Sequence, residues 1–266
     1  MRDTVAMRTL FDRQGLAKMV VIYYAFGREM APFRKKLEQR WPLTANGLRG
    51  FGGVSAGVEF AAIATGIGPA RAREAAERGL AAYPEIDLII TAGVAGALSP
   101  NLAVGDIVIA NRFLLDGGDT KAAIREVEIE PRRIEAVQNM LNEAGFAVST
   151  GCLLTSAGVV ASQDDKREAR LRHGAIAVDM ESGEIALAAS ERHLPVICIR
   201  AIMDTADDDI FAGGLSSDGR VRPLRAAGAL LKEPSALLRI PRMLRNLTLA
   251  SRKLAGAVET VLSHLT

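Results

Sequence analysis

Two stretches decide the fold class of this chain: AVDMES at residues 177–182 and RAIMDTAD at residues 200–207. Each overlaps or follows a short apolar run (Ala175–Val178 and Val196–Ala201), and a helical pattern at Glu181–Glu191 separates the two runs. A strand, a helix and a second strand in this order are typical of a parallel sheet, because the helix crosses over one face. The carboxylates of both stretches then lie at strand C-termini, where open α/β sheets bind ligands.

The same alternation extends through most of the chain. Apolar, β-branched runs predict strands, and Ala-, Arg- and Glu-rich stretches between them predict helices. The further strands are Met19–Ala25, Val58–Ala64, Leu88–Thr91, Asp106–Ala110 and Cys152–Thr155, and the further helices are Glu29–Arg40, Ala70–Ala82 and Pro131–Ala144. This pattern predicts an α/β three-layer sandwich, whose central sheet is mostly parallel or mixed and is covered on both faces.

Composition excludes several classes of protein. The chain has 266 residues, of which 49% are hydrophobic and 24% charged, and this excludes a disordered chain. No run reaches the ~20 apolar residues of a membrane span, and no basic segment precedes the first apolar run as in a signal peptide. Cys152 and Cys198 lie in apolar runs without metal-ligand spacing. We therefore expect reduced cysteines, a cytoplasmic protein, and neither a metal nor an organic cofactor.

Charge is distributed unevenly. The net charge is +2, yet residues 219–266 carry nine basic and two acidic side chains. We predict a leader at 1–17, a body at 18–215 and a basic amphipathic helical tail at 216–266, since apolar residues recur every three or four positions from Leu237 to Leu265. The tail either packs on the body or makes peripheral contact with the inner membrane face through 235–266. It lacks aromatic residues, which argues against a nucleic-acid partner.

Two glycine-containing segments follow or end predicted strands. TGIG at 65–68 frees backbone N–H groups to face an anion or a sugar, but it also suits a plain tight turn. It lacks the third glycine and the acidic residue of a dinucleotide fingerprint. TAGVAGA at 91–97 allows a flat ligand to approach the backbone closely, or a helix to pack tightly on the sheet.

These motifs carry a resemblance. VDMES followed by IRAIMDTADD, with TGIG, AGVAGA and VGDIVIA in matching order, is similar to the purine nucleoside phosphorylase and methylthioadenosine/adenosylhomocysteine nucleosidase superfamily. The likeness runs from about Met19 to Asp208. It implies a nucleoside phosphorylase-like domain, a homo-oligomer, and cleavage of the N-glycosidic bond of a purine nucleoside that releases adenine.

The tail narrows the implied substrate. The segment SSDGR…PLRAAGALLKEPSALLRIPRMLRNL resembles that of the hopanoid-associated phosphorylases, which act on adenosylhopane. This implies a lipophilic 5′ substituent on the nucleoside. Two alternatives stay open at this point: a nucleosidase of the methylthioadenosine/adenosylhomocysteine type, and a non-catalytic nucleoside-binding or membrane-docking protein on the same fold.

The resemblance also assigns roles to residues. Asp204 matches the acid that protonates or hydrogen-bonds N7 of the purine, and Glu181 matches the residue that accepts hydrogen bonds from the ribose hydroxyls. Met203 stands where many nucleosidases have a serine that supports the acid, so Asp204 is expected to be less anchored. Further substrate-binding residues implied by the match are Met180, Ala95, Gly96, Val159 and Val160.

The nucleophile stays open between water and phosphate. Glu29 matches the carboxylate that orients an attacking water, which suits hydrolysis. Phosphate as a co-substrate would instead require cations and backbone N–H groups, and the residues available for such a site are Arg28, Thr65, Gly66 and Gly68. Phosphate-using members place an Arg and a Ser where this chain has Thr91 and Val94, and neither of these side chains can replace them.

Overall fold

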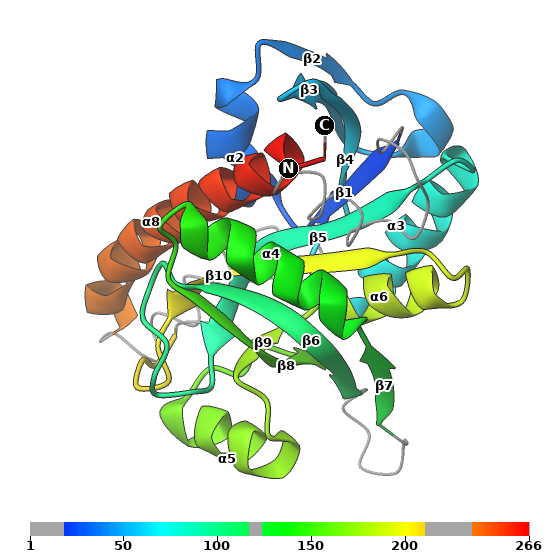
Figure 1. Ribbon diagram of the computed structural model, residues 1–266. Coiled ribbons are helices and arrows are strands. Elements are labelled where there is room, and N and C mark those ends of the chain that lie inside the picture. The colour runs from blue at the N-terminus through cyan, green and yellow to red at the C-terminus, as the bar shows by residue number, and fades with distance from the viewer. Residues whose placement is uncertain (1–18, 117–123, 211–235, 266) are drawn as a thin grey trace.

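The computed structural model describes residues 19–116, 124–210 and 236–265 (Figure 1). The predicted leader at 1–17 and the predicted boundary at 215 lie outside these ranges. The strands are β1 (Val20–Tyr24), β2 (Gln39–Pro42), β3 (Gly50–Ser55), β4 (Val58–Ala64), β5 (Leu88–Ala97), β6 (Ile107–Asp116), β7 (Arg125–Glu128), β8 (Val148–Ser156), β9 (Ala177–Asp179) and β10 (Val196–Asp204). The helices are α2 (Gly27–Lys36), α3 (Pro69–Ala82), α4 (Pro131–Glu143), α5 (Gln163–His173), α6 (Ser182–Ser190) and α8 (Ala236–Ser263), with a 3-10 turn at Ala45–Gly47.

All the strands belong to one mixed sheet, as predicted. Strand β5 pairs with β1 and β10 in parallel and with β9 in the antiparallel direction. The pairings continue from β10 through β6 and β8 to β9 and so return to β5, while β4, β3 and β2 extend the sheet beyond β1. Because β1, β4, β5 and β10 run parallel, their C-terminal ends meet at one edge of the sheet.

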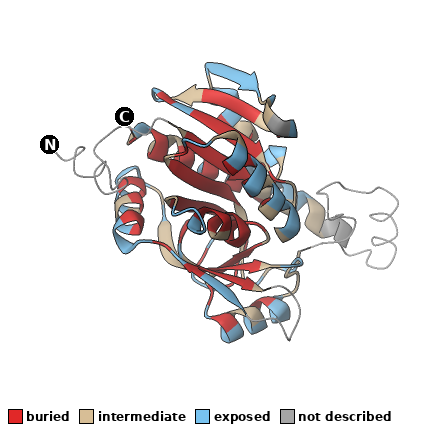
Figure 2. Cartoon of the chain, turned by 90° about the vertical axis from the view of Figure 1, so that its right-hand side faces the viewer, coloured by how far each residue is buried: buried red, intermediate tan, exposed pale blue. Residues whose placement is uncertain are grey.

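Helices form the outer layers. Helix α8 packs against α2, α4, β5 and β10, whereas α3 packs against α6 (Figure 1). Buried residues fill the strands between these helices (Figure 2), and all five side chains of β1 are buried. Burial on both faces explains why β1 is a continuous apolar run rather than an alternating one.

Residues 236–263 of the predicted basic tail form α8, which packs on the domain. Ala250, Leu254, Val258 and Val261 of α8 are fully buried. The opposite face of α8 exposes Leu244 and Leu249 together with several arginines. Within the described ranges no helix is long and apolar enough to cross a membrane. Contact of this helix with a membrane surface stays a prediction.

Several elements differ from those predicted, and β2, β3, β7 and α5 were not predicted. The helix expected to reach Arg40 ends at Lys36, and β2 follows it. Strand β2 is exposed throughout and lies at the sheet edge, so it carries no apolar pattern. Helix α5 was not predicted because its sequence, QDDKREARLRH, is almost entirely polar. The strand predicted at Leu88–Thr91 continues to Ala97, so AGVAGA is part of the strand rather than a turn.

Candidate active site

Glu29 is a buried carboxylate in the first turn of α2, just beyond the C-terminal end of β1. Its Oε2 accepts hydrogen bonds from the backbone N–H groups of Ala25 (2.9 Å) and Phe26 (3.0 Å), which form the loop into α2. Its Oε1 accepts from the backbone N–H of Val94 on β5 at 3.0 Å. Burial raises the pKa of Glu29, while Arg200 and these N–H groups act in the opposite direction. The carboxylate is therefore fixed in position by three backbone donors.

Arg200 of β10 is a buried cation that reasoning from the sequence missed. Its Nε donates to Ser182 Oγ at 2.9 Å, its Nη2 donates to Thr91 Oγ1 at 2.9 Å, and Nη2 also pairs with Asp179 Oδ2 at 2.9 Å. Burial alone would lower the pKa of Arg200, but Asp179 and other nearby anions raise it above its usual value. Nη1 is buried and has no hydrogen-bond partner among the described residues. In the sequence, the one indication that Arg200 is important was its position inside an apolar strand.

Asp179 is the last residue of β9 and forms an ion pair with Arg200. Its Oδ1 accepts from Thr155 Oγ1 at 2.8 Å, and its Oδ2 accepts from the backbone N–H of Ser182 at 3.0 Å. The second bond satisfies the backbone N–H of the first residue of α6, whose N-cap position is Glu181. Asp179 therefore holds the start of α6 and also forms an ion pair with Arg200.

Two glycines of β5 make room for side chains of β10. Gly93 is in register with Arg200, and Gly96 with Asp204, because a β-bulge lies between Ile202 and Asp204. A Cβ on Gly93 would lie 1.7 Å from Arg200 Nη1 and 2.9 Å from Glu29 Oε1. At Gly93 the small residue thus accommodates the protein's own guanidinium, not the flat ligand or packed helix considered from the sequence. Nη1 and Oε1 both border this point.

Glu181 lies between the TGIG turn and the Asp179–Arg200 pair. Its Oε1 accepts from the backbone N–H of Gly68 at 2.7 Å. Burial and the negative charge of Asp179 raise the pKa of Glu181 to about 8. Gly66 and Gly68 have φ of 81° and 104°, a region that favours glycine. The turn therefore presents an N–H group to a protein carboxylate.

Asp204 ends β10 and is almost fully buried. Its Oδ2 accepts from the ammonium of Lys166 on α5 at 2.5 Å. Burial raises the pKa of Asp204, and Lys166 acts against this rise. The expectation that Met203 leaves the acid less anchored is wrong, because a lysine from an unpredicted helix anchors it instead.

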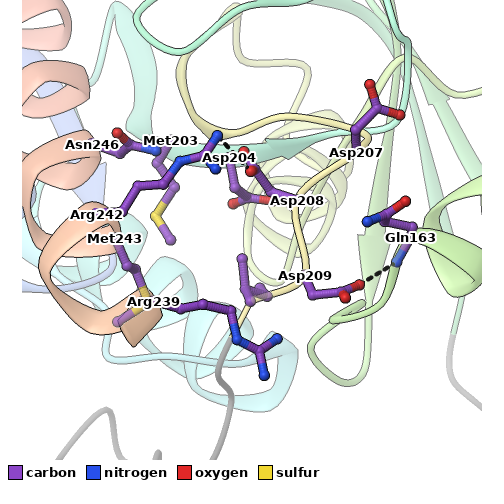
Figure 3. Close-up of a pocket in the computed structure, with 11 residues that line it drawn as sticks. Gln163, Met203, Asp204, Asp207, Asp208, Asp209, Arg239, Arg242, Met243 and Asn246 are labelled. Atoms are coloured by element: carbon purple, nitrogen blue, oxygen red, sulfur yellow. Dashed lines mark hydrogen bonds and ion pairs between the residues drawn. The ribbon is translucent and has the colours of Figure 1, made fainter. Parts of the chain in front are cut away.

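A cavity of about 230 Å³ borders Asp204 (Figure 3). The acidic loop after β10, the start of α5 and the first turns of α8 enclose it. On one wall Arg242 of α8 pairs with Asp208 Oδ1 at 2.8 Å. The other lining residues are Gln163, Met203, Asp207, Asp209, Ile210, Arg239, Met243 and Asn246. Asp204 therefore has a cavity beside its side chain.

A family model and solved structures match this chain. The model of the phosphorylase superfamily matches residues 19–219. The chain belongs to that superfamily. One similar solved structure is the 5′-methylthioadenosine/S-adenosylhomocysteine nucleosidase of Neisseria meningitidis, in complex with methylthio-immucillin-A. Its sequence is 22% identical to this chain, the match covers 92% of this chain and 99% of that chain, and the TM-score is 0.72. The S-adenosylhomocysteine nucleosidase of Streptococcus pyogenes, in complex with 5-methylthiotubericidin, is 20% identical over 96% and 100% of the chains, with a TM-score of 0.73. Futalosine hydrolase of Helicobacter pylori is 17% identical over 92% and 97%, with a TM-score of 0.72.

The superfamily fold brings Glu29, Glu181 and Arg200 together at one end of the sheet. Thr65 of the same edge donates its hydroxyl to the carbonyl of Gly66 at 2.7 Å. Arg28, by contrast, is exposed on the first turn of α2. Gly96 of β5 is in register with Asp204 of β10, so the acid Asp204 lies on the strand next to β5.

The other residues predicted to bind substrate differ in how far they are buried. Ala95 is buried on β5, and Met180 is half-buried between β9 and α6. Val159 is exposed after β8, and Val160 packs against the small apolar cluster that contains Leu154. Substrate contacts of these residues stay predictions. In the part of the chain that the structure describes, no group of three His, Cys, Asp or Glu side chains is placed to hold a metal ion.

Proposed function

We propose that this protein is a nucleosidase that hydrolyses the N-glycosidic bond of a purine nucleoside. The observation that supports this most directly is the meeting of Glu29 Oε1 and the unpartnered Arg200 Nη1 beside Gly93. A buried N–H without a partner costs free energy, and a water molecule between the two groups would satisfy it. The carboxylate would accept the proton of that water, and the guanidinium would orient its oxygen.

The remaining steps follow from the chemistry of the bond. Cleavage passes through a ribosyl cation, so it requires a protonated leaving base and a nearby negative charge. In our proposal Asp204 delivers the proton to N7, and Glu181 accepts hydrogen bonds from the ribose hydroxyls and stabilises the cation. Water then adds to the anomeric carbon and gives its proton to Glu29.

Charge favours water over phosphate as the nucleophile. The carboxylates of Glu29 and Asp179 lie near the guanidinium of Arg200, so an incoming phosphate dianion would face like charges. Two of the groups considered for a phosphate site are unsuitable here. The N–H of Gly68 already donates to Glu181, and Arg28 is exposed.

For the substrate we propose an adenine nucleoside with an apolar 5′ substituent. The similarity of the tail to hopanoid-associated proteins favours adenosylhopane. The homo-oligomer implied by the family is a further expectation, which analytical ultracentrifugation would test.

The first test is release of free base, followed chromatographically with and without phosphate. The substrates are adenosylhopane, methylthioadenosine, adenosylhomocysteine and inosine. We expect adenine release that is independent of phosphate, and a decrease of ~10²–10⁴-fold in Glu29→Gln, since a positioned base typically contributes that factor. Glu38→Gln, an exposed carboxylate beyond the same helix, serves as the control and should keep the wild-type rate. Release that requires phosphate would contradict hydrolysis, and no release from any substrate would contradict the proposed function.

A second prediction concerns pH and Glu181. Because burial and Asp179 raise the pKa of Glu181 to about 8, this side chain is mostly neutral in the free protein at pH 7. Only the ionised carboxylate, present above that pKa, can accept from the ribose hydroxyls with both oxygens. We expect kcat/KM to rise about tenfold per pH unit up to about pH 8 and then to level off. Steady-state kinetics from pH 5 to 9 would check this, and Glu181→Gln should lose this dependence. A flat wild-type profile below pH 8 would refute the assignment.

A further inference from the structure

Lys166 is a fully buried lysine with an unusual set of partners. Its Nζ donates to Asp204 Oδ2 (2.5 Å), to the carbonyl of Thr205 (2.7 Å) and to the carbonyl of Asp208 (2.8 Å). An ammonium has three N–H donors, so every donor is used. The side chain therefore joins α5 to the carboxylate of Asp204 and to the loop that follows it.

This arrangement divides the two oxygens of Asp204 between two tasks. Oδ2 is held by the ammonium, and Oδ1 receives no hydrogen bond from the described residues. Asp204 also borders the cavity described above. Oδ1 is thus the oxygen left to meet a ligand. A neutral donor could hold the loop at lower desolvation cost than a buried charge, so the choice of lysine points to a role beyond packing.

We propose that Lys166 is a positioning residue that fixes Asp204 Oδ2, so that Oδ1 faces the leaving base and delivers its proton. This inference rests on the proposed function. Before cleavage, the carboxyl of Asp204 carries the transferable proton. As the N-glycosidic bond breaks, its electron pair stays on the purine and N7 takes that proton from Oδ1. A carboxylate paired with the Lys166 ammonium is left, and solvent returns the proton after the base departs.

The ammonium also favours release of the proton by Asp204. Burial raises the pKa of this carboxyl, and the positive charge of Lys166 opposes that rise. The carboxylate that forms when the proton leaves is therefore stabilised by the same contact that fixes Oδ2. The other charged groups around the pair are Asp208, which forms an ion pair with Arg242, and Asp207, Asp209 and Arg239 of the cavity wall.

Two substitutions test the proposal with different outcomes. Lys166→Arg keeps a cation at this position, but a planar guanidinium cannot direct its donors to the same three oxygens as an ammonium. We expect a stable protein whose kcat is at least tenfold lower, because the carboxyl of Asp204 is displaced. Lys166→Met removes the cation that opposes the effect of burial on the pKa of Asp204, so the alkaline limb of its pH profile should move to higher pH. Arg167→Met is the matched control, because it removes an exposed charge one position along α5.

The results separate this proposal from the function on which it rests. Thermal unfolding shows whether each variant is folded, and Lys166→Arg carries the test if Lys166→Met does not fold. An active wild type together with a wild-type kcat in Lys166→Arg, or with an unshifted pH profile in a folded Lys166→Met, would overturn the positioning role of Lys166 and leave the nucleosidase intact. A wild type that releases no base from any of the four nucleosides would overturn the proposed function itself.

Discussion

Asp204→Asn should lower kcat by ~10²–10⁴-fold, the contribution typical of a positioned acid. The amide cannot deliver a proton to N7, while its size and shape match those of the carboxyl. Its oxygen can still accept the hydrogen bond from Lys166, so we expect less destabilisation than the ~3–5 kcal/mol that loss of a buried charged partner costs. Single-turnover release of adenine, combined with thermal unfolding, would separate the chemical effect from the structural one.

The control for this experiment is Asp207→Asn. Asp207 lies three residues further along the chain on the rim of the same cavity, but it is exposed. This variant removes a negative charge from the neighbourhood without touching the acid, and its rate should stay close to that of the wild type. A fully active Asp204→Asn protein would exclude Asp204 as the proton donor.

Gly93→Ala should damage both stability and activity. The new Cβ would lie 1.7 Å from Nη1 and 3.0 Å from Cζ of Arg200, so the guanidinium has to move. It is held by Asp179, Thr91 and Ser182, and its displacement would strain a buried ion pair. We expect a loss of about 1–3 kcal/mol in the free energy of unfolding, as for other overpacked cores. We also expect a decrease in kcat of at least ~10-fold, because a misplaced group loses much of its catalytic contribution.

Gly27→Ala provides the comparison. A Cβ on Gly27, the first residue of α2, meets no atom within 4 Å, and this glycine is as close to Glu29 in sequence as any on that helix. Urea unfolding and kcat should both be close to wild-type values for this variant. If Gly93→Ala behaved in the same way, Arg200 would have room to spare, and its proposed part in holding water would be refuted.

Local sequence patterns were sufficient to predict most of the framework. Nearly continuous apolar runs predicted β1, β4 and β10, because a strand buried on both faces is mostly apolar. Helices α3 and α4 were predicted within a residue or two for a similar reason, since each begins with a proline in its first turn and carries an apolar stripe. By contrast, exposed β2 and highly charged α5 lacked such a pattern, because little of their surface is buried.

The sequence alone also determined that Glu181 and Asp204 stand where strands end, because the exit from a strand is a local property. Only the tertiary structure decided what those carboxylates touch. Lys166 is 38 residues from Asp204, and Thr91 is 109 residues from Arg200. Such pairs form through the docking of α5 and the bulged register between β5 and β10, and neither leaves a periodic signal in the chain. The same register explains why TAGVAGA carries glycines: they stand opposite Arg200 and Asp204, whose side chains occupy the space that a Cβ would need.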